Sequence, residues 1–153
     1  MSNLYAWMAG FLDGEGSISL RSEIRPNGQL IFRRRVCVVN TNEPVLQVFK
    51  DNFGGSLRAR TYMKRYSFTA RHKIVYEWSL HGTKADQFIS AILPHLRLKK
   101  RHAELWLEFS ETVDHKLTGN FGGGLRNWNP SVLDRRQALI VELRALNRRG
   151  VAI

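Results

Sequence analysis

Two acidic residues and two glycines follow an apolar segment near the start of the chain, in the order Asp13-Gly14-Glu15-Gly16. Residues 4–12 contain no proline and no β-branched side chain, so they favour a helix that ends at this acidic cluster. The C-terminal end of a helix carries partial negative charge, which disfavours carboxylates unless a cation compensates them. Carboxylate oxygens bind divalent cations, so the cluster predicts a metal-binding turn. The alternative is an ordinary acidic turn after a buried helix.

The same segment has a stripe of very small residues. Ala6, Gly10 and Gly14 lie four residues apart, and such a stripe on a helix lets a second backbone pack very closely. Trp7 and Phe11, also four apart, give the helix a bulky second face. The pattern therefore indicates a helix that packs closely against another element or another copy of the chain.

The chain is strongly basic. Its 153 residues include 24 Lys and Arg against 13 Asp and Glu, a formal net charge of +11. Such a charge indicates a polyanionic partner, most often nucleic acid, with an anionic membrane surface as the weaker alternative. No run reaches the roughly eighteen apolar residues of a membrane-spanning helix, and no signal peptide is visible. Cys37 is the only cysteine, which excludes an intrachain disulfide and a cysteine-rich zinc site.

Hydrophobic periodicity and turn residues divide the chain into short elements. In chain order they predict a helix over 4–12, strands over 17–25 and 30–40, a helix over 43–53, strands over 56–62 and 71–80, helices over 83–93 and 96–113, a loop over 119–130 and a helix over 131–149. The order α-β-β-α-β-β-α, with helices appended, predicts an α+β fold with a twisted antiparallel sheet and helices on one face. We expect one domain over 1–153, with a core over 1–112 and a C-terminal loop and helix over 113–153.

Two features of these predicted elements concern single residues. Arg34 falls on the apolar side of the second strand and interrupts its pattern. In the helix over 96–113, the expected buried stripe includes Leu98, Trp106 and Phe109.

The uncovered face of the sheet is predicted to be rich in arginine, because alternate residues of a strand point the same way. Arginine matches guanine edges bidentately and also holds phosphates, and a two-stranded ribbon fits the major groove of B-DNA. We expect a DNA-binding face, with a merely solvated basic surface as the alternative. The predicted contact residues are Ser17, Ser19, Arg21, Glu23, Arg25, Arg33, Arg35, Cys37, Arg58, Arg60, Tyr62 and Lys73.

The acidic cluster and a DNA-binding face together suggest phosphodiester hydrolysis. Two divalent ions held by carboxylates can position the attacking water and neutralise charge at the phosphate and the leaving oxygen. One chain offers a single acidic cluster, so a second copy, related by a two-fold axis, would complete the site. We therefore predict a homodimer whose interface contains Ala6, Gly10, Asp13 and Gly14.

Residues 8–18 read MAGFLDGEGSI, which resembles the LAGLIDADG motif of homing endonucleases. The resemblance implies a saddle-shaped sheet that reads DNA, and homodimers for members with a single motif. It implies that Glu15, where many members have Asp, binds the divalent ion together with the backbone carbonyl of Gly14. Asp13 matches the first acid of the motif, which looks more structural.

A second segment, from Pro94 to Lys99, is similar to the P-x-L-x-x-K segment of the same family. The resemblance implies that Lys99 approaches the scissile phosphate through water, where a cation stabilises negative charge. Lys100 and Arg101 are alternatives for this role. Asn40 matches the position of a polar residue that orders the water network, so Glu15, Lys99 and Asn40 are the predicted catalytic residues.

The implied function is that of a Mg²⁺-dependent endonuclease, with Mn²⁺ as a substitute and Ca²⁺ supporting binding without cleavage. It would cut both strands of a long pseudo-palindromic DNA site and so promote mobility of its host intron. We expect an intracellular protein, in a prokaryotic cytoplasm or nucleoid or in an organelle, with no membrane partner. The alternatives are a maturase that binds intron RNA, a non-cleaving DNA-binding protein of the same fold, and a general RNA- or ribosome-binding protein.

Overall fold

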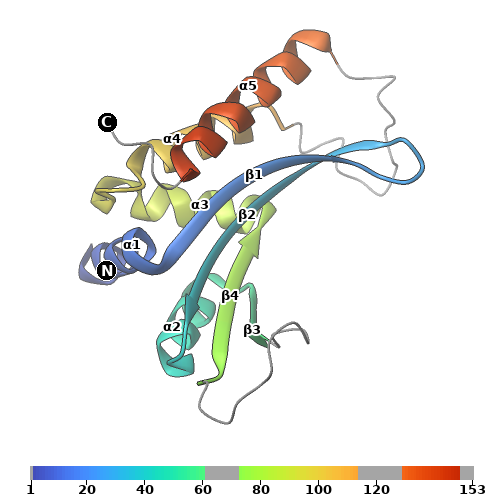
Figure 1. The fold of residues 1–153 in the computed structure, drawn as a ribbon. Coiled ribbons are helices and arrows are strands. Elements are labelled where there is room, and N and C mark those ends of the chain that lie inside the picture. The colour runs from blue at the N-terminus through green and yellow to red at the C-terminus, as the bar shows by residue number, and fades with distance from the viewer. Residues whose placement is uncertain (1, 61–72, 114–128, 149–153) are drawn as a thin grey trace.

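The computed structural model describes residues 2–60, 73–113 and 129–148. The predicted order of elements is confirmed (Figure 1). The elements are α1 (Ser2–Glu15), β1 (Gly16–Ile24), β2 (Leu30–Asn40), α2 (Glu43–Phe53), β3 (Ser56–Arg60), β4 (Val75–His81), α3 (Gly82–Ile92), a 3-10 turn η1 (Leu93–His95), α4 (Lys100–Glu111) and α5 (Pro130–Asn147). In the described part of the chain, no helix is both long and apolar enough to cross a membrane.

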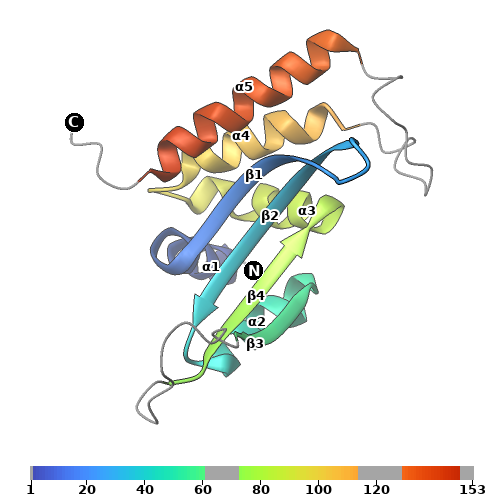
Figure 2. The same cartoon turned by 45° about the vertical axis from the view of Figure 1, so that its right-hand side comes forward.

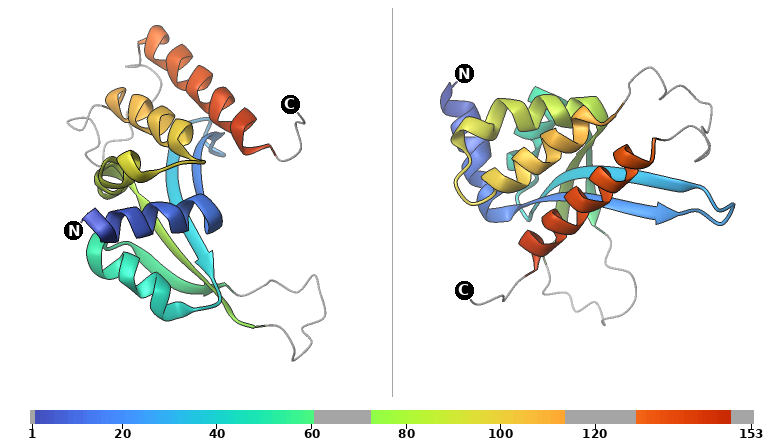
Figure 3. Two further views of the ribbon diagram at one scale, coloured as in Figure 1. Left: turned by 90° about the vertical axis from the view of Figure 1, so that its left-hand side faces the viewer. Right: turned by 90° about the horizontal axis from the view of Figure 1, so that it is seen from above.

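The four strands form one sheet in the order β1-β2-β4-β3, and every neighbouring pair is antiparallel. The helices lie on one face of this sheet, and the other face is left open (Figures 2 and 3). Alternate strand residues such as Ile18, Val36 and Trp78 are fully buried beneath the helices. The α+β arrangement with helices on one face is therefore confirmed.

An aromatic cluster fills the core between the sheet and the helices. The ring of Trp78 lies 5.0 Å from that of Phe49 and 5.1 Å from that of Phe88, measured between centroids. The indole nitrogen of Trp78 donates a hydrogen bond of 2.8 Å to the carbonyl of Gly54. Gly55 follows with a φ of +89°, and a Cβ there would lie 2.5 Å from the carbonyl oxygen of Ser79, so this turn requires glycine.

The hairpin of β1 and β2 extends beyond the other strands. β2 pairs with β4 only from Arg35 onward, so residues 30–34 pair with β1 alone. The hairpin consequently projects past the helices (Figures 1 and 3). Its turn is closed by Gly28, whose φ is +80° and whose N–H donates to the carbonyl of Arg25 at 2.8 Å.

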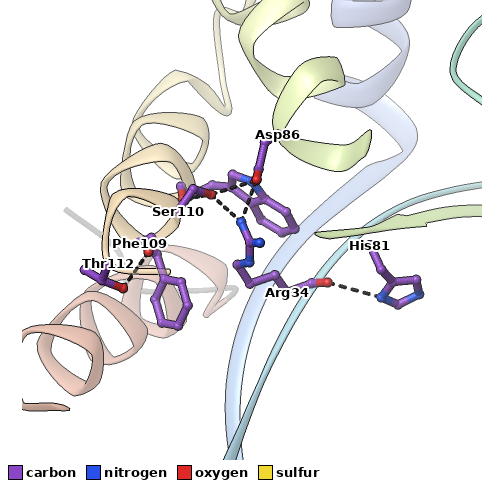
Figure 4. A network of polar contacts seen from close by, with 7 residues as sticks. Arg34, His81, Asp86, Phe109, Ser110 and Thr112 are labelled. Atoms are coloured by element: carbon purple, nitrogen blue, oxygen red, sulfur yellow. Dashed lines mark hydrogen bonds and ion pairs between the residues drawn. The ribbon is translucent and has the colours of Figure 1, made fainter. Parts of the chain in front are cut away.

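Arg34, which interrupts the apolar pattern of β2, has partners in the helical layer (Figure 4). Its guanidinium group forms an ion pair with Asp86 of α3 and a hydrogen bond with Ser110 of α4. Asp86 also accepts a hydrogen bond of 2.8 Å from the indole of Trp106. A largely buried charge is tolerated when it is paired and hydrogen-bonded in this way, and the network joins β2 to both helices.

Three predicted boundaries differ from the structure by three or more residues. α1 continues through the acidic cluster to Glu15 instead of ending at residue 12. α4 begins at Lys100 instead of residue 96, and the predicted burial of Leu98 is wrong, since this residue is 76% exposed. The strand predicted over 71–80 begins at Val75, while residues 71 and 72 lie outside the described residues. The reason for the late start of α4 lies in the contacts of Asp13.

Candidate functional site

The acidic cluster forms the last turn of α1 and leads directly into β1. A Cβ on Gly16 would lie 2.7 Å from the carbonyl oxygen of Leu12, so the exit from the helix requires glycine there. This sharp exit brings the end of α1 to the end of the sheet where β1 begins. Glu15 is exposed at this point, whereas Asp13 is buried.

The carboxylate of Asp13 faces its own chain. One oxygen accepts a hydrogen bond of 2.7 Å from the backbone N–H of Arg97, and the other accepts one of 2.8 Å from that of Lys99. These bonds hold residues 96–99 outside the helix, which explains why α4 begins only at Lys100. The ammonium group of Lys99 also donates to the carbonyl of Asp13. The charge of Asp13 at the helix end is thus compensated from within the chain.

Lys99 and Glu15 lie within electrostatic reach of each other. Partial burial lowers the pKa of Lys99, and the negative charges of Asp13 and Glu15 act in the opposite direction. The structure therefore brings together Glu15 and Lys99, two of the three predicted catalytic residues, from segments far apart in the chain. Spacing along the chain alone did not show that these two residues lie near each other.

The donor groups at this end of α1 are hard oxygen atoms, which suit Mg²⁺. The carboxylate of Glu15 and the backbone carbonyl of Gly14 are the oxygens that could hold such an ion. Among the described residues, no three His, Cys, Asp or Glu side chains gather in a way that could hold a metal. The described part of one chain accordingly supplies an incomplete set of ligands.

α1 presents an exposed face without charge. Ala6, Gly10 and Gly14 are exposed, and a Cβ added to either glycine would meet nothing within 4 Å. Trp7 is 40% exposed beside this stripe. Asp13, which was predicted to lie at the same interface, accepts hydrogen bonds from Arg97 and Lys99 of its own chain.

The open face of the sheet carries the side chains that strand alternation predicts. In the register of β1 and β2, Ser17 lies opposite Cys37, Ser19 opposite Arg35 and Arg21 opposite Arg33. Near the outer end of the hairpin, Glu23 forms a bidentate ion pair with Arg33, with distances of 2.8 and 2.9 Å. Arg58 and Arg60 lie on β3 at the opposite edge of the sheet. Lys73 is exposed just before β4, and Tyr62 lies outside the described residues.

Glu77 was not among the predicted site residues, although it lies in the middle of this basic face. Its side chain is 1% exposed and contacts Arg35, Arg58 and Arg60. Alternation along β4 places Glu77 on this face. The sequence did not give the strand order, which places β4 between β2 and β3 and so brings arginines of both strands to Glu77.

Three other predicted site residues, Ser19, Cys37 and Asn40, are hydrogen-bonded or buried within the chain. The hydroxyl of Ser19 donates to the carbonyl of Arg35 at 3.2 Å. Cys37 is buried, which raises the pKa of its thiol. The side-chain oxygen of Asn40 accepts a hydrogen bond of 2.8 Å from the N–H of Asn42, as in a turn that leads into α2.

A cleft of about 760 Å³ lies beside the end of α1. Arg21 of β1, Lys99, and Arg144 and Arg148 from the end of α5 are among its lining residues. Gly14 and Gly16 also line the cleft, so the backbone at the end of α1 and the basic side chains border the same space. This arrangement suits an extended polyanion that runs from the open face past Glu15.

No family model and no curated protein matches this chain. Solved structures of homing endonucleases do match it. The match to I-CvuI in complex with its target covers 97% of this chain and 84% of that one, with a TM-score of 0.72 and 23% identity. The archaeal intron-encoded I-Vdi141I complexed with DNA matches over 95% and 85%, with a TM-score of 0.70 and 18% identity.

A third match differs in extent. The LAGLIDADG homing endonuclease I-GzeII, in complex with its DNA target, matches 97% of this chain but only 46% of its own, with a TM-score of 0.61 and 18% identity. At these identities the similarity establishes the fold. The chain has the fold of the LAGLIDADG homing endonucleases.

Proposed function

We propose that a protein with this fold and this site is a single-motif homing endonuclease. As a homodimer that depends on a divalent metal, it cuts both strands of a long pseudo-palindromic DNA site and promotes the mobility of its host intron. The observation that carries the proposal is the position of Glu15. This exposed carboxylate ends an uncharged helix face and lies near Lys99. Its neighbours Gly14 and Gly16 line a basic cleft that continues along β1 to Arg21 on the open face.

The exposed face of α1 supports the homodimer. A surface helix normally turns polar residues outward, but Ala6, Trp7 and Gly10 are exposed on α1, and residues 2–12 contain no charge. A second copy packed on this stripe would cover it and bring the two Glu15 carboxylates together. The match to about half of I-GzeII fits the same view, since two copies of this chain correspond in length to one such protein.

In the dimer, the Glu15 carboxylates and the Gly14 carbonyls would hold Mg²⁺. When bound, the metal would activate water and neutralise charge on the phosphate, and Mn²⁺ would substitute for it. The ammonium group of Lys99 stabilises the charge that develops on the phosphate oxygens. Asp13 orients Lys99 by accepting its backbone N–H, and Asn40 orders the water. The arginines of the open face hold the DNA backbone and base edges.

The decisive experiment is cleavage of a randomised duplex DNA library in Mg²⁺, Mn²⁺, Ca²⁺ or EDTA, with the wild type and Glu15→Gln compared. We expect double-strand cuts in Mg²⁺ at one enriched, two-fold-related site. The variant should lose cleavage and keep binding in Ca²⁺. Sequence-specific binding without cleavage under any divalent ion would contradict the nuclease and favour a non-cleaving protein of this fold.

A further inference from the structure

Glu77 lies at the centre of the open face, on β4 between β2 and β3. The register places it opposite Val39 of β2 and opposite Arg58 of β3. The described strands carry only one other acidic side chain on this face, Glu23 at the outer end of the hairpin. Glu77 is therefore a single negative charge inside the most basic part of the sheet.

The carboxylate of Glu77 joins three arginines from the two strands that flank it. One oxygen forms an ion pair with Arg35 of β2 and accepts a hydrogen bond of 3.1 Å from Arg58 of β3. The other oxygen accepts from Arg60 at 2.9 Å. Three positive charges and one negative charge leave the cluster with a net charge of two.

The contacts cover the carboxylate but leave the arginines accessible. The side chain of Glu77 is 1% exposed, while those of Arg35, Arg58 and Arg60 are 31%, 67% and 45% exposed. A guanidinium group has five N–H donors in a rigid fork, so an arginine bound to Glu77 on one side can still offer donors to a ligand. The arginines are thereby oriented before any ligand arrives.

A buried carboxylate paired with arginines adds little to the free energy of unfolding. Desolvation of the charges offsets much of their attraction, and well-packed apolar residues often do as well. What the carboxylate adds is orientation. A free arginine has many rotamers and binds any phosphate it can reach, whereas an arginine held in one geometry binds only a ligand that matches it.

We propose that Glu77 is a positioning residue that holds Arg35, Arg58 and Arg60 for reading base edges and restrains them from contacts with phosphates. The inference rests on the proposed function, because it assumes that the open face binds DNA. Each copy of the chain would bind one half of the DNA site, and its preference for base sequence would depend in part on Glu77, a residue that need not touch DNA.

The test compares wild type, Glu77→Gln, Glu77→Asp and Glu142→Gln in Ca²⁺. Glu142 is an exposed residue of α5 paired with Arg101, so its variant makes the same change of charge away from the sheet. The measurements are affinity for the selected site and for random duplex, base preference at each position, and the slope of log affinity against log salt. A melting curve for each variant checks folding.

For Glu77→Gln we expect the ratio of specific to random affinity to fall about 10-fold or more, since each bidentate base contact discriminates on that order. Affinity for random duplex should rise, and the salt slope should steepen by about one as a freed arginine takes a phosphate. Glu142→Gln should keep the wild-type ratio and base preferences. Glu77→Asp keeps the charge and should recover part of the preference.

An unchanged ratio and base profile in a folded Glu77→Gln variant would overturn the proposal. If that variant does not fold, Arg58→Gln and Arg60→Gln serve instead. Each should remove preference at its own base position, and an equal loss of affinity for all sequences would overturn the proposal. A wild-type protein with no sequence preference would instead contradict the proposed function itself.

Discussion

At the scale of single residues, two acidic side chains at the end of α1 have different roles. Asp13 and Glu15 are both acids in the last helical turn, but Asp13 is buried and accepts two backbone N–H groups, while Glu15 is exposed. Asp13 thereby holds the segment that carries Lys99. Glu15 is left as the carboxylate that a metal or a second copy of the chain can reach.

Asp13→Asn should lower the free energy of unfolding by about 1–3 kcal/mol. An amide has one oxygen where the carboxylate has two, so one of the N–H groups of Arg97 and Lys99 loses its acceptor. Urea denaturation in EDTA measures the difference. Glu15→Gln is the matched control and should change stability by less than about 0.5 kcal/mol, as exposed substitutions usually do. Equal stability of the two variants would contradict the structural role of Asp13.

The thiol of Cys37 should react slowly in the native protein. Burial raises its pKa, and the nearby guanidinium group of Arg35 only partly opposes this effect. Because the thiolate is the reactive form, the native rate should rise at a higher pH than in the unfolded chain. Rates with a thiol reagent, measured against pH with and without denaturant, check the prediction. A native rate equal to that of the unfolded chain would show it to be wrong.

At the scale of elements, polar contacts join the hairpin to the helical layer. Among the described strands, residues 30–34 of β2 pair with β1 alone. Arg34 compensates for this through its ion pair with Asp86 of α3 and its hydrogen bond with Ser110 of α4 (Figure 4). The projecting half of the hairpin is thus held by a buried network as well as by strand pairing.

Asp86→Ala should destabilise the protein by about 3–5 kcal/mol, because it leaves the largely buried charge of Arg34 without its counterion. The double variant Arg34→Met with Asp86→Leu removes both charges and should recover part of this loss, because the indole N–H of Trp106 still lacks its acceptor. Denaturant unfolding of the two variants gives the comparison. Should Asp86→Ala cost less than about 1 kcal/mol, the network would not hold the hairpin.

At the scale of the whole molecule, we propose that a second copy completes the site. One chain supplies one exposed carboxylate at the end of α1, and the described residues contain no complete group of metal ligands. The uncharged, exposed face of α1 is the surface through which a second chain would complete the site.

Gly10→Glu should give a folded monomer. The side chain has room, since a Cβ there meets nothing within 4 Å, and the glutamate favours the helix more than glycine does. A charge in the stripe would be buried without a partner in the dimer. Sedimentation should show a dimer for the wild type and for Gln87→Glu, an exposed control on α3. A dimeric Gly10→Glu variant would exclude this interface.

The sequence by itself determined the order of elements, the faces of the strands and the acidic end of α1. These features are local, because alternation and turn residues act within a few positions. Only the tertiary structure decided that Asp13 binds Arg97 and Lys99, that Leu98 is exposed, and that Glu77 meets arginines of two other strands. Those contacts depend on strand order and on close approach of distant segments, which spacing along the chain does not encode.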